Sequence, residues 1–232
     1  MKNLLIYTRE DRQFSKEAKT LAKIQVDNSL LFFKAEDILI FTNFKFEYNG
    51  IKSIVIPDCS YKPDRTNKIP AIVYLIENGL LPNETIWYHD FDAFQVKQFT
   101  IDIDQLGLTS YGYKNSWNGG SFFFKPNKDV FKLWNSEIRP ENRCDEKALN
   151  RLTRNSKLEH KHLGVIYNFN QRLPYFSNFD STEPSVLHFH PNYKHYRADE
   201  TNINIFMYGK NRLGKIYMSD QLIDIFKKNG VK

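Results

Sequence analysis

Short apolar runs alternate with segments of helical periodicity through the first half of the chain. The apolar runs predict buried strands at 4–8, 38–41, 54–56 and 85–89. Apolar residues at helical spacing predict a helix over 14–31 and another over 67–79, the latter with Pro70 in its first turn and Gly79 after its last. Strands that alternate with helices are typical of an α/β fold, in which helices flank a mostly parallel, Rossmann-like central sheet.

The second half of the chain is less regular. Strands are predicted at 121–124 and 186–189, and helices at 128–134, capped by Asn127, at 146–154, and after Ser219. Neither an internal repeat nor a low-complexity linker divides the sequence. We therefore expect one domain over residues 1–232.

The composition fits a globular protein with a large core. Hydrophobic residues make up 41% of the 232 residues and aromatic residues 15%, which supplies ample apolar surface for burial. No apolar stretch approaches the ~20 residues that span a bilayer, and the first eight residues turn polar too early for a secretory signal. Two cysteines are too few for a disulfide scaffold. We expect a cytoplasmic protein with no transmembrane segment and with both cysteines reduced.

The chain is basic, with a formal net charge of +6. This charge favours an anionic partner, such as nucleic acid, a phosphorylated ligand or a membrane surface, and does not choose among them. Arg65 and Lys68 lie at the start of a predicted helix, where the helix dipole disfavours cations. Their presence there suggests a bound anion, although a solvated run of charge would explain them equally.

Two Asp-x-Asp triplets are candidates for carboxylate chemistry, and about one is expected by chance in a chain of this composition. Residues i and i+2 of an extended segment point the same way, so Asp90 and Asp92 can present two carboxylates to one Mn²⁺ or Mg²⁺ ion. This pair follows a buried strand, at the edge where open α/β sheets bind ligands. Asp102 and Asp104 follow no strong strand, and we expect solvated carboxylates on an edge whose isoleucines are buried.

Three further segments could carry chemistry, and each also has a purely structural interpretation. His188, at the end of the late strand, could ligate a metal or simply hydrogen-bond a loop. Residues 118–120, an Asn-Gly-Gly triplet, allow a ligand close to the backbone, or form a turn or bulge. Asp145 and Glu146, at the start of a helix, could meet a substrate or only stabilise the helix dipole.

The order of these segments along the chain resembles that in glycosyltransferases of the GT-A fold. These are single-domain enzymes that bind a nucleotide-diphosphate sugar through a divalent metal and an Asp-x-Asp motif. Residues 86–93 look like the strand with the metal motif, and residues 117–127 are similar to the Asn-x-Gly strand of the glycogenin-like branch. Residues 144–150 look like the Asp-Gln-x-x-Leu-Asn helix of that branch, and residues 186–189 match the late strand whose histidine completes the metal site. Small virus-encoded capsid glycosyltransferases of this fold are similar in size.

The resemblance implies a metal-dependent hexosyltransferase that moves a sugar from a nucleotide-diphosphate donor, preferably a UDP-sugar, to a glycan or glycoprotein acceptor. Residues from 1 to about 116 would form the nucleotide-binding half, and residues 117–232 the sugar and acceptor half. Asp90, Asp92 and His188 would hold Mn²⁺ (or Mg²⁺). The residues implied to contact the donor are Thr8, Arg9, Arg65, Lys68, Asp90, Asn118, Gly119, Gly120 and Ser121.

Two departures from the glycogenin-like pattern leave the stereochemical course open. Glu146 replaces the glutamine, and Lys194-His195-Tyr196 stands where that branch shows Lys-Pro-Trp. A carboxylate near the acceptor could serve as general base in an inverting displacement. Asp145 and Glu146 are therefore the candidate catalytic residues.

Two other functions fit part of the sequence. A metal-dependent nucleotidyltransferase or phosphohydrolase also uses paired aspartates and a basic phosphate site, but it has no use for the Asn-Gly-Gly strand. A nucleic-acid-binding domain would use the basic and aromatic residues. Because most aromatic residues fall within predicted strands and helices, we expect them to pack in the core, and nucleic acid is the less favoured partner.

Overall fold

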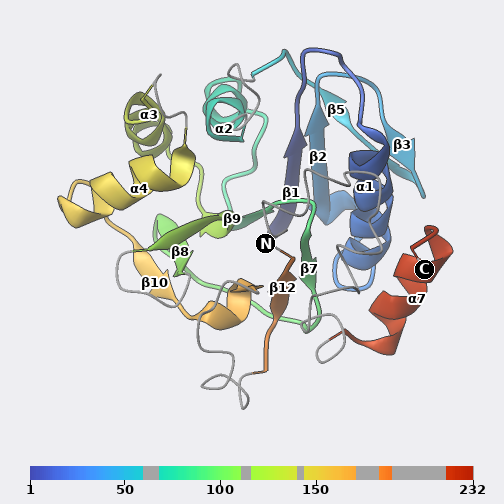
Figure 1. Cartoon of the computed structure of the whole chain (residues 1–232). Coiled ribbons are helices and arrows are strands. Elements are labelled where there is room, and N and C mark those ends of the chain that lie inside the picture. Colours follow the sequence, from blue (N-terminus) through green and yellow to red (C-terminus); the bar gives the residue numbers. More distant parts are fainter. Residues whose placement is uncertain (60–67, 111–115, 140–143, 171–182, 190–217, 232) are drawn as a thin grey trace.

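The computed structural model describes residues 1–59, 68–110, 116–139, 144–170, 183–189 and 218–231. Its centre is a seven-stranded sheet with the order β10-β8-β9-β6-β1-β2-β5 (Figure 1). The strands are β1 (Lys2–Tyr7), β2 (Ile38–Thr42), β5 (Ile54–Val55), β6 (Ile86–His89), β8 (Leu106–Ser110), β9 (Trp117–Phe124) and β10 (Lys161–Leu163). Strand β9 runs antiparallel to β6 and β8, and the other neighbouring pairs are parallel. The predicted mostly parallel sheet is confirmed.

Two smaller sheets accompany the central one. Strands β11 (Phe169–Asn170), β12 (Val186–His188) and β7 (Ala93–Gln95) form a three-stranded sheet, and β3 (Glu47–Tyr48) pairs with β4 (Ile51–Lys52) in a hairpin. Strand β12 is antiparallel to β7, and His188 lies opposite Ala93 in this register. The register therefore brings a late histidine next to the Asp-x-Asp triplet.

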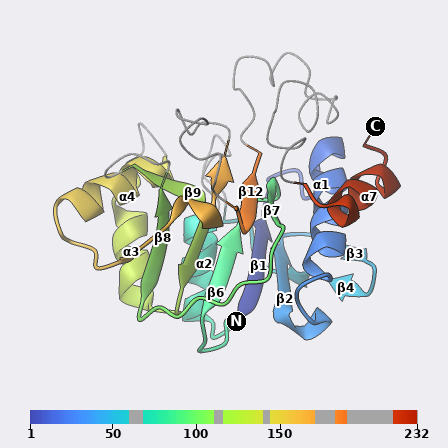
Figure 2. The ribbon, with the colours of Figure 1, turned by 90° about the horizontal axis from the view of Figure 1, so that it is seen from below.

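Helices cover both faces of the central sheet (Figures 1 and 2). They are α1 (Lys16–Ser29), α2 (Lys68–Glu77), α3 (Lys128–Ser136), α4 (Asp145–Arg154) and α7 (Asp220–Lys228), with short 3-10 turns η1 (Ala35–Asp37) and η2 (Val165–Tyr167). Successive side chains of a strand point to opposite faces. Leu4 and Ile6 of β1 thus pack with α2, α3 and α4, whereas Leu5 packs with Val26 of α1.

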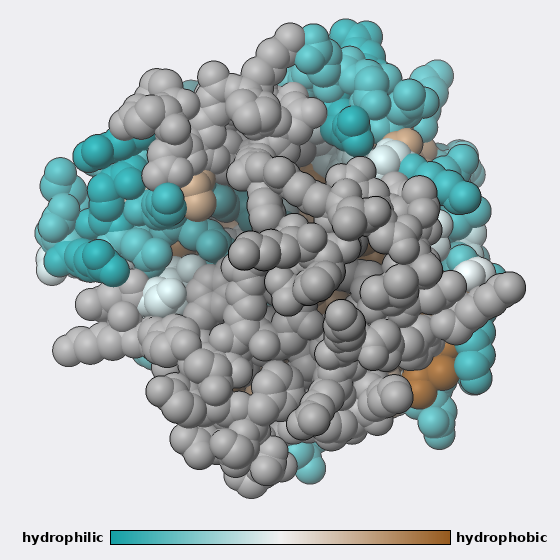
Figure 3. Space-filling model, viewed as in Figure 1, coloured by the Kyte–Doolittle hydropathy of each residue, from teal (hydrophilic) through white to brown (hydrophobic). Residues whose placement is uncertain are grey.

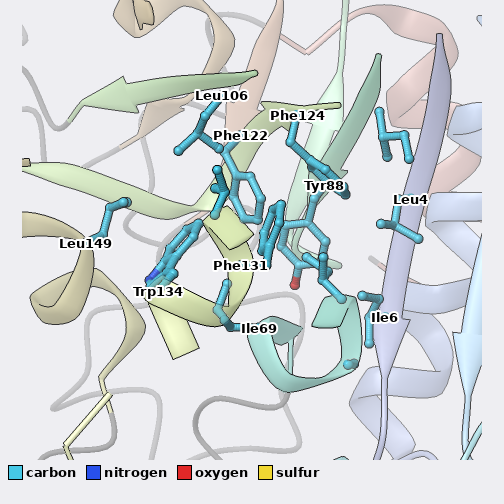
Figure 4. Packing of buried hydrophobic residues seen from close by; sticks show 14 of the residues in the cluster. Leu4, Ile6, Ile69, Tyr88, Leu106, Phe122, Phe124, Phe131, Trp134 and Leu149 are labelled. Carbon is cyan, nitrogen blue, oxygen red and sulfur yellow. The ribbon is translucent and has the colours of Figure 1, made fainter. Parts of the chain in front are cut away.

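The largest core cluster lies between the sheet and α2, α3 and α4, and it is rich in aromatic rings (Figure 4). The ring centroids of Phe122 and Trp134 are 5.3 Å apart, and those of Phe124 and Phe131 are 4.8 Å apart. The indole N–H of Trp134 donates to the carbonyl of Asp145 at 3.0 Å. The core therefore fixes the start of α4 against the sheet.

The predicted elements are present, with some ends shifted. Strand β9 begins at Trp117 rather than at residue 121, so the Asn-Gly-Gly triplet lies within the strand and is not a turn. The pairing of β8 with β9 shifts register at this triplet, between the pairs Leu108–Phe122 and Ser110–Trp117, which agrees with the interpretation as a bulge. Helix α1 begins at Lys16 after its capping residue Ser15, so it is shorter than the predicted 14–31. Helix α4 begins at Asp145, one residue earlier than predicted. The capping side chains of Asn127 and Ser219 accept hydrogen bonds from the first turns of α3 and α7, as predicted.

The surface and the cysteines agree with the composition. Hydrophilic residues dominate the described part of the face shown in Figure 3. Among the helices of the described segments, none combines the length and the apolar character needed to cross a bilayer. Cys59 and Cys144 are free thiols.

Candidate metal centre and active site

The carboxyl ends of β1 and β6 lie side by side where the strand order of the sheet reverses. The chain places β2 on one side of β1 and later places β6 on the other side. Open α/β sheets bind their ligands at such a switch point. Asp90 follows β6 directly, and its backbone N–H donates to the carbonyl of Gly120 at 2.8 Å. The antiparallel strand β9 therefore places residues 118–120 beside the Asp-x-Asp triplet.

Asp90, Asp92 and His188 come together at this edge. One potential ligand atom from each residue lies within 4.8 Å of the other two. The Nε2 atom of His188 is 3.1 Å from Oδ1 of Asp92, and the backbone N–H of Phe189 donates to the carbonyl of Asp92 at 2.9 Å. Two carboxylates and one imidazole form a donor set that suits Mn²⁺ or Mg²⁺.

The glycines of β9 allow the backbone to lie against these ligands. A Cβ atom on Gly120 would lie 2.2 Å from Cε1 of His188 and 2.9 Å from Oδ2 of Asp90. A Cβ atom on Gly119 would lie 2.7 Å from Oδ2 of Asp145. These distances are shorter than real Cβ contacts, so a side chain at either position would displace one of these groups. The cradle and the donor set together fit a divalent ion.

Lys68 places a buried positive charge between two carboxylates. Its Nζ donates to the carbonyl of Gly119 at 2.7 Å and lies 3.2 Å from both Oδ1 of Asp90 and Oδ2 of Asp145. Burial alone would lower the pKa of Lys68, but the carboxylates of Asp145 and Asp90 hold it well above its ordinary value. Lys68 therefore stays charged and compensates both aspartates.

Asp90 is held in its ionised form by its surroundings. Burial alone would raise the pKa of Asp90, but the nearby Lys68 ammonium and His188, together with a hydrogen bond from Tyr88, hold this pKa below its ordinary value. The Tyr88 hydroxyl donates to Oδ1 of Asp90 at 2.6 Å. The Asp90 side chain is still 35% exposed, so it remains accessible to a ligand.

Both predicted catalytic carboxylates lie at the site, on the first turn of α4. Asp145 is buried and forms the ion pair with Lys68. Glu146 accepts a hydrogen bond at Oε1 from the backbone N–H of Gly119 at 3.0 Å. Both carboxylates therefore have contacts with protein groups on the side of the site formed by β9.

The polar side chains of β9 face different surroundings. Asn118 accepts a hydrogen bond at Oδ1 from the N–H of Gly120 at 2.6 Å, and its buried Nδ2 has no hydrogen-bond partner among the described residues. Ser121 accepts from Nε1 of Trp87 at 3.0 Å and donates to the carbonyl of Tyr167 at 2.8 Å. Asn118 thus retains donor capacity, whereas the Ser121 hydroxyl joins β9 to β6 and η2.

Thr8 and Arg9, two of the residues expected to contact the donor, directly follow β1. Thr8 is fully buried. The backbone N–H of Arg9 donates to Oδ1 of Asn43 at 3.1 Å, and its Nε lies 3.2 Å from Oδ1 of Asp11. Arg65 lies outside the described residues.

Two buried amides on α1 hold the Asp-x-Asp segment, and neither was among the residues predicted from the sequence. Gln25 donates through Nε2 to the carbonyls of Phe91 at 3.0 Å and Ala93 at 2.6 Å. Asn28 exchanges two hydrogen bonds with the backbone of Gln95, at 2.9 and 3.1 Å. The signal that could have found them is the presence of polar residues on the buried face of an amphipathic helix.

The second Asp-x-Asp triplet lies apart from this chemistry. Asp102 and Asp104 are exposed, while Ile101 and Ile103 are buried. This arrangement confirms the prediction of solvated carboxylates on an edge with buried isoleucines.

Comparisons with known proteins identify the fold. No protein-family model matches the sequence, and no curated protein matches it. The crystal structure of the glycosyltransferase GlyE in Streptococcus pneumoniae TIGR4 is similar, with a TM-score of 0.58, 12% sequence identity, and coverage of 99% of this chain and 64% of that chain. The apo form of GlyE gives a TM-score of 0.57 at 12% identity and covers 100% of this chain. The protein therefore has the α/β fold of these glycosyltransferase structures and spans 64% of their length.

Proposed function

We propose that the protein is a metal-dependent glycosyltransferase that moves a sugar from a nucleotide-diphosphate donor, preferably a UDP-sugar, to a hydroxyl of a glycan or glycoprotein acceptor. The observation that carries this proposal is the convergence of Asp90, Asp92 and His188 at the switch point of the sheet. The likeness of the fold to GlyE supports the same class of reaction.

The residues around the ligands suit a negatively charged donor. Mn²⁺ or Mg²⁺ held by Asp90, Asp92 and His188 would neutralise charge on the leaving nucleoside diphosphate. The Lys68 ammonium pairs with Asp90 and Asp145, both at 3.2 Å, and orients these two carboxylates. The Nδ2 of Asn118 is a hydrogen-bond donor available to the sugar, because it is buried without a partner in the described structure.

The contacts of the two carboxylates on α4 favour positioning roles. The Asp145 carboxylate is engaged by the Lys68 ammonium, at 3.2 Å. Glu146 accepts from the N–H of Gly119, a contact that an amide oxygen could make equally well. These contacts favour a retaining course, in which no protein base on this side removes the acceptor proton.

The test is incubation of the protein with UDP- and GDP-sugars in the presence of Mn²⁺ or of a chelator. We expect release of the free nucleoside diphosphate with Mn²⁺ and none with the chelator. Asp92→Asn should abolish the release, and Asp104→Asn should not, because Asp104 is an exposed carboxylate outside the site. Release of phosphate or pyrophosphate instead would indicate a phosphohydrolase or a nucleotidyltransferase.

A further inference from the structure

Three buried hydrogen bonds lead from the ring of His188 to the backbone of β9. The Nδ1 atom of His188 lies 2.8 Å from Oδ1 of Asn168, and Nδ2 of Asn168 donates to Oγ1 of Thr109 at 3.0 Å. The Thr109 hydroxyl donates in turn to the carbonyl of Ser121 at 2.6 Å. All four residues are at most 1% exposed, so water does not compete for these groups.

The Ser121 carbonyl, the last acceptor, sets the donor and the acceptor in each of these three hydrogen bonds. A carbonyl oxygen cannot donate, so the single hydroxyl proton of Thr109 points to Ser121 and the Thr109 oxygen accepts from Asn168. The NH₂ group of Asn168 therefore faces Thr109, and its oxygen faces His188. Because an amide oxygen only accepts, Nδ1 of His188 carries a proton; we assign this tautomer from the hydrogen-bond network.

The assigned tautomer determines what Nε2 can do. A neutral imidazole with its proton on Nδ1 has a lone pair on Nε2. This lone pair lies 3.1 Å from Oδ1 of Asp92, which is also an acceptor. Two acceptors at this distance repel each other unless a proton or a metal ion lies between them; in an imidazolium ring the proton on Nε2 fills this place, and a bound metal ion would replace that proton.

We propose that Asn168 and Thr109 are positioning residues that fix the tautomer of His188, so that Nε2 is kept as a lone-pair donor for the metal. The proposal rests on the metal site of the proposed function. This series of hydrogen bonds, which we call the relay, also joins three elements that are distant in sequence. Thr109 lies on β8, Asn168 directly follows η2, and His188 ends β12. It thereby sets the ring orientation of His188 relative to the central sheet.

The test is nitrogen NMR of the imidazole rings in the metal-free protein at about pH 9, well above the ordinary histidine pKa. The His188 signals are identified by their loss in His188→Gln. In the wild type we expect a protonated Nδ1 and an unprotonated Nε2. Thr109→Ser, which keeps the hydroxyl, should retain this spectrum. Thr109→Val, which removes it at nearly constant shape, should show both tautomers.

Mn²⁺ affinity from calorimetry provides the second measurement. Loss of an outer hydrogen-bond partner of a metal-binding histidine lowers metal affinity by about 10- to 100-fold, so we expect this loss in Thr109→Val and in Asn168→Leu, and little change in Thr109→Ser. A neutral wild-type ring with its proton on Nε2 instead of Nδ1, or a Thr109→Val variant with wild-type tautomer and affinity, would overturn the proposal. A wild-type ring protonated on Nδ1 that binds no Mn²⁺ would support the relay and contradict the metal site of the proposed function.

Discussion

Gly120 lies so close to His188 that it has no room for a side chain: a Cβ atom would be 2.2 Å from Cε1 of the imidazole. The same atom would be 2.9 Å from Oδ2 of Asp90. The backbone of β9 therefore forms one wall of the candidate metal site, in contact with two of its three ligands. Gly120 therefore leaves the room that these two ligands occupy.

Gly120→Ala should therefore weaken metal binding. The added methyl group must displace the imidazole or the Asp90 carboxylate, and we expect Mn²⁺ affinity to fall by about 10-fold or more, as for other changes that disturb ligand orientation. Calorimetric titration measures the effect. Gly164→Ala is the matched control, because its Cβ would have no neighbour closer than 3.9 Å and its φ is −64°. Wild-type Mn²⁺ affinity in Gly120→Ala would contradict the close packing of β9 against His188 and Asp90.

Lys68→Met should destabilise the fold. It removes the ammonium from between Asp90 and Asp145 and leaves the Asp145 carboxylate buried without its ion-pair partner. Breaking a buried ion pair in this way costs about 3–5 kcal/mol, which urea unfolding would measure. Adding Asp145→Asn should recover part of the loss, because the uncompensated charge is then removed.

The control for that experiment is Lys132→Met. Lys132 lies 2.7 Å from Glu77, but both side chains are well exposed, so solvent screens their interaction and little change in stability is expected. Equal effects of the two lysine substitutions would contradict the buried charge network.

Glu146→Gln should leave kcat within a few-fold of the wild type. The amide oxygen of glutamine can accept the Gly119 N–H that Oε1 of Glu146 now accepts. Glu146→Ala removes this contact and should lower kcat further. A fall of about 100-fold or more in the glutamine variant, in the range of a lost general base, would instead make Glu146 the catalytic base of an inverting reaction.

Asp27 gives the protein a predictable pH dependence of stability. Its buried carboxylate ties the C-terminal end of α1 to Tyr48, Lys228 and Asn229. Burial alone would raise the pKa of Asp27, but hydrogen bonds from Lys228, Asn229 and Tyr48 hold this pKa below the ordinary 3.8. A carboxylate of this kind stabilises the fold above pH 3.8, and its contribution is lost as the pH falls through the folded-state pKa.

Asp27→Asn should accordingly be less stable than the wild type at neutral pH, by about 1–3 kcal/mol for the loss of a buried charged acceptor. The difference in unfolding free energy should shrink as the pH is lowered below about 4. Asp224→Asn, at an exposed position of α7, is the control and should show no such trend. A difference that persists unchanged at low pH would contradict the role of the Asp27 charge.

The sequence predicted the parts of the molecule that depend on local pattern. The strand that ends at His89 is buried and apolar, and this locates Asp90 and Asp92 at a sheet edge; the caps of α3 and α7 also follow from local signals. The predicted start of β9 was wrong, because two consecutive glycines usually mark a turn. Here the glycines lie within the strand, at a shift in the register between β8 and β9 and beside His188.

The parts that the sequence could not predict depend on long-range register. Gln25 meets Phe91 across 66 positions, and Asn168 meets Thr109 across 59. Neither pair has a periodic signal, because each contact exists only after β7, β11 and β12 have assembled against the central sheet. The small strands that build this region are two or three residues long, too short for an alternating pattern to be recognised.

The central claim is that Asp90, Asp92 and His188 hold a divalent metal for a nucleotide-diphosphate donor. The most direct test is calorimetric titration of UDP into the protein with and without Mn²⁺, repeated with Asp92→Asn and with the matched variant Asp104→Asn. We predict that UDP binds only with Mn²⁺ in the wild type and in Asp104→Asn, and that Asp92→Asn abolishes this binding. UDP binding that is indifferent to Mn²⁺, or full metal-dependent binding in Asp92→Asn, would contradict the account.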